Sequence, residues 1–346
     1  MGKKIEKLAV DLRVGGLGDV WMRLVGFYAM AALRKNLAFS LSIPRPLESI
    51  AFHAFGDRLE IKTDPDPACI TYSVRGLRDL LPKALGGQKF AAPYGRAVIK
   101  TWDRWTPRDR LNSFLYALAD SGGLVFSPPW NSLSDYQGFS ETILLPHLRN
   151  VSSDGFRAQV IADHDFISRR VDEFSGQFSE KLSRRTTQKV LVFPTGTGRQ
   201  FIPVAWAKRN LHHAVFAIYD RDPELGEWQS SGLQTILYSS PGEIAAIGLA
   251  ARVAVTTDSF PSHILQHSGT RLVILITGTE RSRVVTPGFK GHVVDAVAPC
   301  HPCPHLERRG FPICKAGYQV CLNWDSAEYT RKILQLIGSI GMRGSN

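Results

Sequence analysis

The sequence has few acidic residues for its number of basic ones, and it has no long apolar run. Its 346 residues include 31 Asp and Glu against 42 Lys and Arg, a formal net charge of +11. This imbalance predicts attraction to anions: a phosphorylated substrate, nucleic acid or an acidic lipid surface. No run approaches the roughly 18 apolar residues of a membrane span. The amino terminus also lacks the apolar core of a signal peptide, so we expect a cytoplasmic protein.

Internal repeats and low-complexity tracts are also missing, and the composition is that of an ordinary globular protein. Apolar residues make up 44% of the chain and charged residues 21%, enough to bury a core in each of two domains. We expect an amino-terminal domain over residues 1–165, a linker over 166–188 and a carboxyl-terminal domain over 189–330. A helix and tail follow at 331–346.

Cysteine is scarce, and four of the five cysteines lie within a short segment at 300–321. Cys300, Cys303, Cys314 and Cys321 have the spacing C-x2-C-x10-C-x6-C. In a reducing cytoplasm such a cluster suits a structural zinc or iron ion better than disulfides, and four protein ligands leave no open position for catalysis. Free or paired thiols are the alternative.

Short apolar runs alternate with helical patterns along most of the chain. In the first half the expected strands are 7–14, 38–43, 58–63 and 70–74, with helices at 20–35 and 47–56. In the second half the expected strands are 190–194, 214–220, 235–240, 253–258 and 271–278, with helices at 242–252 and 261–269. This alternation predicts an α/β fold with parallel sheets. We therefore expect two Rossmann-like domains that face each other across a cleft, with ligands at the carboxyl ends of the strands.

Asp258, Ser259 and His263 lie between two apolar runs and suggest a hydrolase triad. Neighbouring Asp and Ser side chains diverge, and the G-x-S-x-G elbow is missing, so the spacing is poor triad geometry. Asp258 and Ser259 instead suit the start of a helix, with Pro261 in its first turn and Gly269 at its C′ position. The free N–H groups of such a start favour a phosphate, and simple capping is the alternative.

Three segments, in this order, resemble glycosyltransferase family 9, the ADP-heptose:lipopolysaccharide heptosyltransferase-like enzymes. They are RVGGLGDVWMRLVGFYAMAAL (13–33), VLVFPTGTGRQFIPVAWAKR (190–209) and TDSFPSHILQHSGTRLVILITGT (257–279). The cysteine segment resembles an insertion found in many members. Phe260 stands where the family often has Gly. The family's Lys ahead of Trp-Pro is not matched, and Arg199 would supply its charge from one position earlier. The resemblance implies the two-domain GT-B fold.

The resemblance also implies an inverting glycosyl transfer, with a heptose as one candidate sugar. Asp19 would be the general base, on a flexible loop that contains Gly16 and Gly18 and helps to bind the acceptor. The alternative for Asp19 is a cap on the helix at 20–35. Glycosyl transfer needs such a base for the acceptor hydroxyl and stabilisation of the departing diphosphate.

The donor, for which an ADP-sugar is the leading candidate, would bind the carboxyl-terminal domain. The residues expected to contact it are Thr195, Gly196, Thr197, Arg199, Asp258, Ser259, His263, Gly278 and Thr279. An ordinary polar loop is the alternative for several of them. Because helix N-termini and Arg can carry the diphosphate charge, no catalytic metal is required. One of Asp220, Asp222 and Glu224 could accept hydrogen bonds from the ribose.

The acceptor would bind the amino-terminal domain, where basic residues alternate with tryptophan. Lys100, Trp102, Arg104 and Trp105 would suit an anionic glycan, and a solvated basic face is the alternative. Two rival functions remain open. The first is a nucleic-acid-binding protein that uses this basic segment and the cysteines. The second is a sugar-nucleotide epimerase. The positive net charge is also compatible with peripheral attachment to an anionic membrane.

Overall fold

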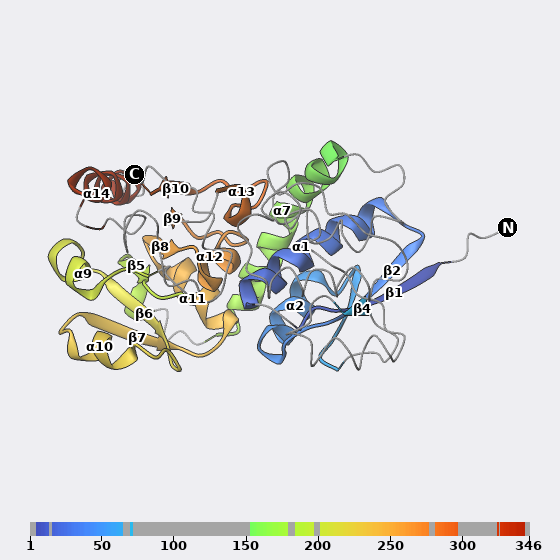
Figure 1. Ribbon diagram of the computed structural model, residues 1–346, viewed down its shortest axis with the longest axis horizontal. Helices are drawn as coiled ribbons and strands as arrows, with labels where there is room; N and C mark the ends of the chain where they lie inside the picture. Colours follow the sequence, from blue (N-terminus) through green and yellow to red (C-terminus); the bar gives the residue numbers. More distant parts are fainter. Residues whose placement is uncertain are drawn as a thin grey trace, which may run out of the picture. The chain divides into compact units, whose positions relative to one another are not determined.

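The computed structural model describes residues 5–13, 16–64, 70–71, 153–178, 184–196, 201–276, 281–296, 324 and 326–342. The chain divides into two compact units (Figure 1). The first unit comprises Met1–His164 and Thr286–Gly288, and the second comprises Asp165–Val285 and Phe289–Asn346. Helix α7 (Ser153–Ser175) contributes to both, and it extends into the segment expected as a linker.

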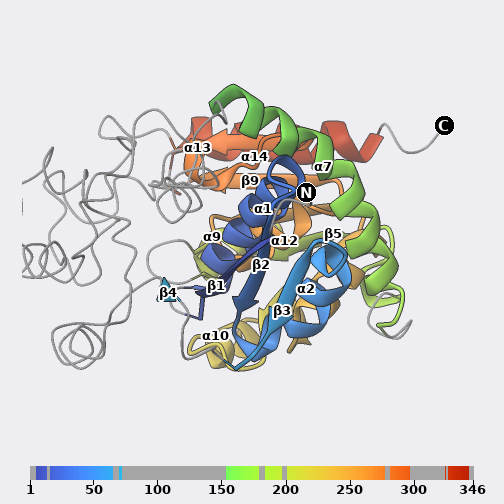
Figure 2. The same cartoon turned by 90° about the vertical axis from the view of Figure 1, so that its right-hand side faces the viewer.

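The first unit contains a parallel sheet of four strands in the order β3-β2-β1-β4. Its strands are β1 (Glu6–Asp11), β2 (Leu37–Ser42), β3 (Leu59–Lys62) and β4 (Ile70–Thr71). Helices α1 (Leu17–Leu33) and α2 (Glu48–Phe55) and the short 3-10 helix η1 (Arg45–Leu47) connect them. Figure 2 shows β1, β2 and β3 side by side, with α2 beside β3.

Aromatic contacts join the helices of the first unit to each other and to the sheet. Trp21 of α1 lies 5.0 Å from Phe55 of α2, between ring centroids, and Phe27 lies 5.3 Å from Phe39 of β2. All four side chains are buried. Burying such large rings is a major source of stability in a domain of this size.

The second unit contains a parallel sheet of six strands in the order β10-β9-β8-β5-β6-β7. The strands are β5 (Val190–Phe193), β6 (Val215–Tyr219), β7 (Gln234–Tyr238), β8 (Val253–Thr257), β9 (Leu272–Ile276) and β10 (His292–Asp295). β8 and β9 are buried along their whole length. Strands buried in this way are typical of parallel sheets that are covered on both faces.

Within the described residues, several helices accompany this sheet in addition to α7. They are α9 (Val204–Asn210), α10 (Leu225–Ser230), α11 (Pro241–Ala250), α12 (Phe260–Leu265), α13 (Arg281–Val284) and α14 (Ala327–Met342). The buried core joins α9, α10 and α14 to the sheet through Trp206, Trp228 and Ile333. The Nε1 of Trp206 donates to the Thr330 hydroxyl at 2.9 Å, which ties α9 to α14.

The α/β fold and its parallel sheets are confirmed. Two differences from the expected helix bounds affect candidate site residues. α1 begins three residues before the expected residue 20, so Gly18 and Asp19 belong to a helix and not to a flexible loop. α12 ends at Leu265, and Gly269 is therefore not its C′ residue. The Gly269 N–H instead donates to the Asp172 carboxylate of α7, 3.0 Å from each oxygen.

Candidate active site

The strand order of the second sheet has a reversal between β5 and β8. From β5 the chain passes to β6 and β7 on one side, and then to β8, β9 and β10 on the other. Phe193 of β5 pairs with Thr256 of β8, so the loops after these two strands leave the same edge as neighbours. In open α/β sheets ligands bind at the carboxyl ends of the strands where the order reverses.

Two of the expected donor residues stand in the loop after β5. Thr195 is buried and Gly196 is half-buried. The Ile202 N–H donates to the Pro194 carbonyl at 2.7 Å and closes the loop before α9. Thr197 and Arg199, which would follow in this loop, lie outside the described residues.

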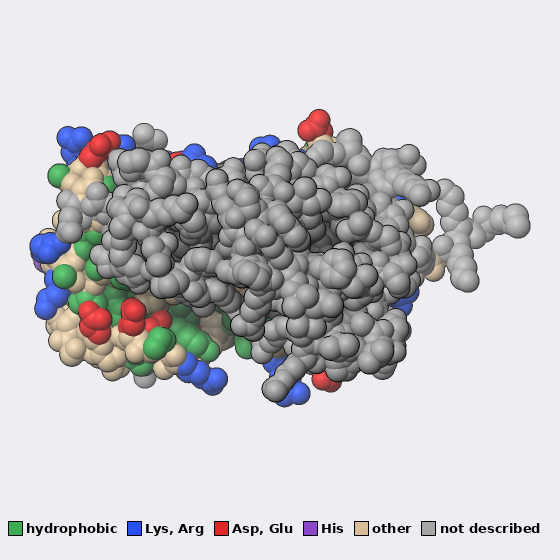
Figure 3. Space-filling model, viewed as in Figure 1, with side chains coloured by type: hydrophobic (Ala, Val, Ile, Leu, Met, Phe, Trp, Pro, Cys, Tyr) green, Lys and Arg blue, Asp and Glu red, His purple; other side chains and the backbone are tan. Residues whose placement is uncertain are grey.

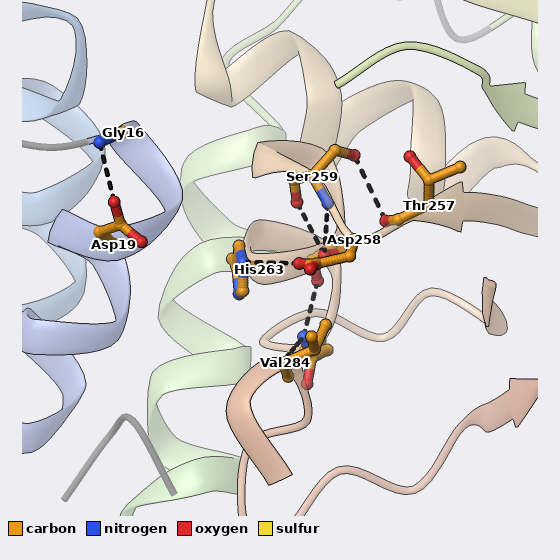
Figure 4. Close-up of polar contacts among 9 residues, drawn as sticks. Gly16, Asp19, Thr257, Asp258, Ser259, His263 and Val284 are labelled. Carbon is orange, nitrogen blue, oxygen red and sulfur yellow. Dashed lines mark hydrogen bonds and ion pairs between the residues drawn. The ribbon is translucent and has the colours of Figure 1, made fainter. Parts of the chain in front are cut away.

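The loop after β8 carries a buried polar cluster that leads into α12 (Figure 4). Ser259 is the N-cap residue, but its hydroxyl donates back to the Thr257 carbonyl at 3.3 Å. The Ser262 hydroxyl donates to the Ser259 carbonyl at 2.7 Å. The Ser262 hydroxyl also accepts from the Ser259 N–H, at 3.4 Å. Phe260, at the family's Gly position, is half-buried at the first residue of α12.

His263 and Asp258 point toward each other in this cluster (Figure 4). The Nε2 of His263 lies 3.8 Å from Oδ1 of Asp258, and both side chains are buried. The Ser259 hydroxyl faces the Thr257 carbonyl, so the three side chains do not form the ordered chain of contacts that a triad requires. The buried His263 imidazole can instead donate a hydrogen bond to an anion at this edge of the sheet.

Gln266 fastens α12 to α13. Its side-chain nitrogen donates to the Ser262 carbonyl at 3.2 Å and to the Val284 carbonyl at 2.9 Å. Gln266 is buried, and a buried amide donor is costly to leave unpaired. These bonds therefore hold the polar cluster in place. Gly278 and Thr279, expected donor residues between β9 and α13, lie outside the described residues.

Acidic residues follow β6, two strands from β8 in the same sheet. Oδ1 of Asp222 accepts from the Glu224 N–H at 2.9 Å, and Oδ1 of Asp220 lies 4.0 Å from Nε of Arg221. Figure 3 shows acidic side chains among hydrophobic ones over the region of β6, β7 and α10. Glu224 is exposed, and partial desolvation by the surrounding chain raises the pKa of its carboxyl, as do the neighbouring carboxylates of Asp222 and Glu227.

Three aromatic residues end the strands beside these acids. Phe193, Tyr219 and Tyr238 are the last residues of β5, β6 and β7. The ring of Tyr238 lies 5.7 Å from Phe193 and 5.8 Å from Tyr219, between centroids. Burial raises the pKa of Tyr238, so its hydroxyl is protonated at neutral pH. The alternation pattern predicted these strands but gave no sign that their last residues form a row.

In the first unit, Asp19 stands in the first turn of α1. Its Oδ2 accepts from the Gly16 N–H at 2.9 Å, which caps the helix (Figure 4). The capping alternative for Asp19 is therefore confirmed, and one carboxylate oxygen is used for it. Gly16 is the N-cap, and Gly18 is buried inside the first turn. The backbone of Gly18 is thus fixed by the helix.

Asp11 and Arg13, at the end of β1, were not candidates from the sequence. The Arg13 Nε lies 2.9 Å from Oδ1 of Asp11, and its Nη2 lies 3.0 Å from Oδ2. The signal in the sequence was an Asp and an Arg two residues apart in a strand, a spacing that places both side chains on one face.

Several expected site residues lie outside the described residues. They are the basic segment with Lys100, Trp102, Arg104 and Trp105, and the four cysteines Cys300, Cys303, Cys314 and Cys321. Within the described ranges, no group of three or more His, Cys, Asp or Glu side chains is placed to hold a metal ion. The helices in those ranges include none that is long and apolar enough to cross a membrane.

Two solved structures are similar to the whole chain. One is the glycosyltransferase of family 9 from Veillonella parvula, with a TM-score of 0.55, 12% sequence identity and 99% of each chain covered. The other is the E. coli ADP-heptose lipopolysaccharide heptosyltransferase II, with a TM-score of 0.54 and 9% identity, covering 99% of this chain and all of that one.

No protein-family model and no curated protein sequence matches the chain. At 9–12% identity the likeness lies in the fold, and it extends over 99% of the chain. This agrees with the resemblance carried by the three sequence segments. The chain therefore has the fold of the glycosyltransferase family 9 structures, as those segments predicted.

Proposed function

We propose that this protein is a glycosyltransferase that uses a nucleotide-diphosphate sugar. The observation that carries the proposal is the buried polar cluster at the strand reversal of the second sheet, in a chain with the fold of glycosyltransferases. The clustered hydroxyls and imidazole suit a diphosphate, which takes many hydrogen-bond donors. A solved structure of the same fold is named for ADP-heptose, and we propose an ADP-sugar as the donor here.

In this proposal the diphosphate lies against the loops after β5 and β8. Thr195 and Ser259 offer hydroxyl and backbone donors, and Gly196 lets the backbone approach. The His263 ring, whose Nε2 lies 3.8 Å from Oδ1 of Asp258, offers an N–H donor to a phosphate oxygen. These residues would stabilise the charge that develops on the leaving diphosphate.

The acceptor in this proposal is an anionic glycan, such as a lipopolysaccharide core. Asp19 takes the proton from its attacking hydroxyl as the oxygen bonds to the anomeric carbon and the diphosphate departs, with inversion. The cap bond to Gly16 occupies Oδ2 and fixes the orientation of the carboxylate, which leaves Oδ1 for the proton. Capping and base catalysis are therefore compatible at this residue.

Among the three acids after β6, we assign the ribose contact to Glu224. Asp222 already accepts the Glu224 N–H, and Asp220 lies near Arg221. The ionised Glu224 is disfavoured by partial desolvation and by two neighbouring carboxylates, so hydrogen bonds from two ribose hydroxyls would stabilise it. The row of Phe193, Tyr219 and Tyr238 next to it would suit the face of a base.

This assignment predicts that nucleotide binding depends on pH. As the pH falls through the raised pKa of Glu224, the carboxylate is protonated, and we expect ADP to bind about tenfold more weakly. Glu224→Gln should bind ADP weakly at neutral pH and show no such loss on acidification. Calorimetric titrations of ADP at a series of pH values measure both effects.

Stability gives a second measurement for the same variant. Because the folded pKa of Glu224 lies above its unfolded value, the ionised group destabilises the fold at neutral pH. Glu224→Gln should therefore raise the midpoint of urea unfolding at neutral pH, and the gain should disappear below the unfolded pKa. Glu48→Gln, an exposed acid of the first unit, is the control. An unchanged pH profile of binding in Glu224→Gln would rule out the assignment.

The function itself is tested by titrating the full-length protein with ADP, UDP, GDP and CDP. We expect saturable binding of one of them, with ADP the tightest. Binding of none would overturn the proposal. If one binds, mass spectrometry of anionic glycan acceptors incubated with the matching sugar donor should show the added sugar, and a product without a transferred sugar would favour an epimerase.

A further inference from the structure

A carboxylate of α7 holds the chain just after α12. The two carboxylate oxygens of Asp172 each lie 3.0 Å from the Gly269 nitrogen, so its N–H is shared between them. The two residues are 97 positions apart in the sequence, and both belong to the second unit. The connection from α12 to β9, residues 266–271, lies wholly within the described residues. A distant acceptor therefore ties this connection to α7.

The contact depends on a glycine at position 269. A Cβ on Gly269 would lie 3.1 Å from Oδ2 of Asp172 and 3.3 Å from Cδ2 of Leu249 in α11. Both distances are shorter than an ordinary van der Waals contact, so a side chain here would push the carboxylate or α11 away. The chain thus provides an acceptor on α7 and, opposite it, the residue type that allows the close approach.

Hydrogen bonds within and just after α12 connect Gly269 to His263. The Ser268 hydroxyl donates to the Leu265 carbonyl at 2.9 Å. Nδ1 of His267, a fully buried residue, lies 3.1 Å from the His263 carbonyl. α12 has only six residues, and His263 and Gly269 are separated by about two helical turns of chain. Displacement of the chain at Gly269 would therefore move His263.

The backbone that carries Asp172 is itself fixed at the end of α7. The Phe178 ring occupies the space where a Cβ of Gly242 would lie, at the start of α11. Its centroid lies 5.2 Å from that of Phe174, which is buried near the end of α7. The Ser175 hydroxyl donates to the Asp172 carbonyl at 2.6 Å. The Asp172 carboxylate therefore projects from a backbone that is packed against α11.

Stability is a weak reason for a carboxylate at this position. Desolvation raises the pKa of the Asp172 carboxyl, and the hydrogen bond from Gly269 offsets only part of that rise. Because the folded pKa lies above the unfolded one, the ionised group lowers the free energy of unfolding at neutral pH, and this cost disappears below the unfolded pKa. What Asp172 does supply is an acceptor that holds the end of α12.

We propose that Asp172 is a positioning residue of the donor site, which holds Gly269 and thereby fixes α12 and the polar cluster of Asp258, Ser259 and His263. Groups that are already in place lose less freedom when a ligand binds, so the affinity for the diphosphate depends on this contact. The effect on nucleotide binding rests on the proposed transferase function, whereas the fixing of α12 by Asp172 does not.

The first test compares two substitutions at Asp172 in the full-length protein by calorimetry with ADP. Asp172→Ala should weaken binding about tenfold, because the Gly269 N–H loses its acceptor and α12 its anchor. Asp172→Asn keeps one acceptor oxygen and should bind ADP within about twofold of the unchanged protein. Asp165→Ala is the control: it removes an exposed acid of the same helix and should leave the affinity unchanged.

A second pair of variants leaves the carboxylate in place. Gly269→Ala adds a methyl group where the Asp172 carboxylate lies, so it should weaken ADP binding by about threefold or more. Gly338→Ala on α14 is the matched control, because nothing lies within 4 Å of the added carbon. It should leave ADP binding unchanged. This pair gives the same decision if Asp172→Ala does not fold.

NMR of the His263 ring measures the position of α12 without any ligand. The Cε1–H signal of His263 is identified as the one missing from His263→Gln. It should shift or broaden in Asp172→Ala and in Gly269→Ala, and it should stay in place in Asp172→Asn, because only the first two variants release α12. A purely structural role of Asp172 would lower stability without moving this signal.

The outcomes separate the proposal from the function on which part of it rests. If ADP binds to no form of the protein while the His263 signal moves as expected, the proposed function fails and the fixing of α12 by Asp172 stands. An unmoved His263 signal in Asp172→Ala and Gly269→Ala overturns the proposal. So does full ADP affinity in Asp172→Ala, or a loss in Asp172→Asn as large as that in Asp172→Ala.

Discussion

Replacing Asp19 by Asn should reduce sugar transfer by about 10²- to 10⁴-fold while leaving nucleotide binding unchanged. That range is the usual contribution of a general base, and the donor residues belong to other loops. The amide oxygen of Asn can still accept the Gly16 N–H, so α1 should keep its cap. Initial rates of transfer, measured with saturating donor and acceptor, give the first quantity, and calorimetry with ADP gives the second.

Asp19→Ala separates the two roles of this residue. It removes both the base and the cap, so it should lose transfer like Asp19→Asn and also lose about 1 kcal/mol of unfolding free energy. Ser326→Ala is the matched control, since the Ser326 hydroxyl accepts the Tyr329 N–H at 3.3 Å at the start of α14. It should show a similar loss of stability with full transfer. Retention of more than half of the transfer rate by Asp19→Asn would contradict the base assignment.

Trp206→Ala should lower the free energy of unfolding by about 3–5 kcal/mol, the usual effect of deleting a buried tryptophan ring. Trp206 is 1% exposed, its ring centroid lies 4.9 Å from that of Trp324, and its Nε1 donates to Thr330. The substitution opens a cavity between α9 and α14. Urea unfolding followed by circular dichroism measures the change.

Two milder variants divide this effect into its parts. Trp206→Phe keeps most of the ring but loses the hydrogen bond, and Thr330→Val removes the acceptor while it preserves the volume. We expect each to cost about 1–3 kcal/mol, because each leaves a buried polar group or a smaller cavity. If Trp206→Ala cost less than Thr330→Val, packing of the ring would not be the main contribution.

Trp206 also shows how a motif residue can have a structural role. It lies in the segment 190–209 whose resemblance to glycosyltransferase family 9 helped to predict the fold. The structure places its side chain in the core, where it bonds to Thr330 of α14. The residues matched in that segment therefore include one that packs α9 into the core, as well as the residues of the loop before α9.

The residues at which the helices begin and end depend on contacts that cannot be predicted from the pattern of apolar residues. α1 begins at Leu17 because the Gly16 N–H finds an acceptor in Asp19, which adds a turn before the apolar face. Gly269 suggested a longer α12, yet its N–H is bound by Asp172, nearly a hundred residues earlier in the chain. A distant acceptor of this kind cannot be read from local spacing.

The sequence by itself determined the strands, their parallel pairing and the α/β class, because strands buried on both faces must be apolar throughout and their connections must be helical. It also placed Asp258, Ser259 and His263 at a strand end. Only the tertiary structure decided that β5 lies beside β8, that His263 faces Asp258, and that partial desolvation raises the pKa of Glu224. These depend on which distant segments pack together, and local spacing in the sequence does not contain that information.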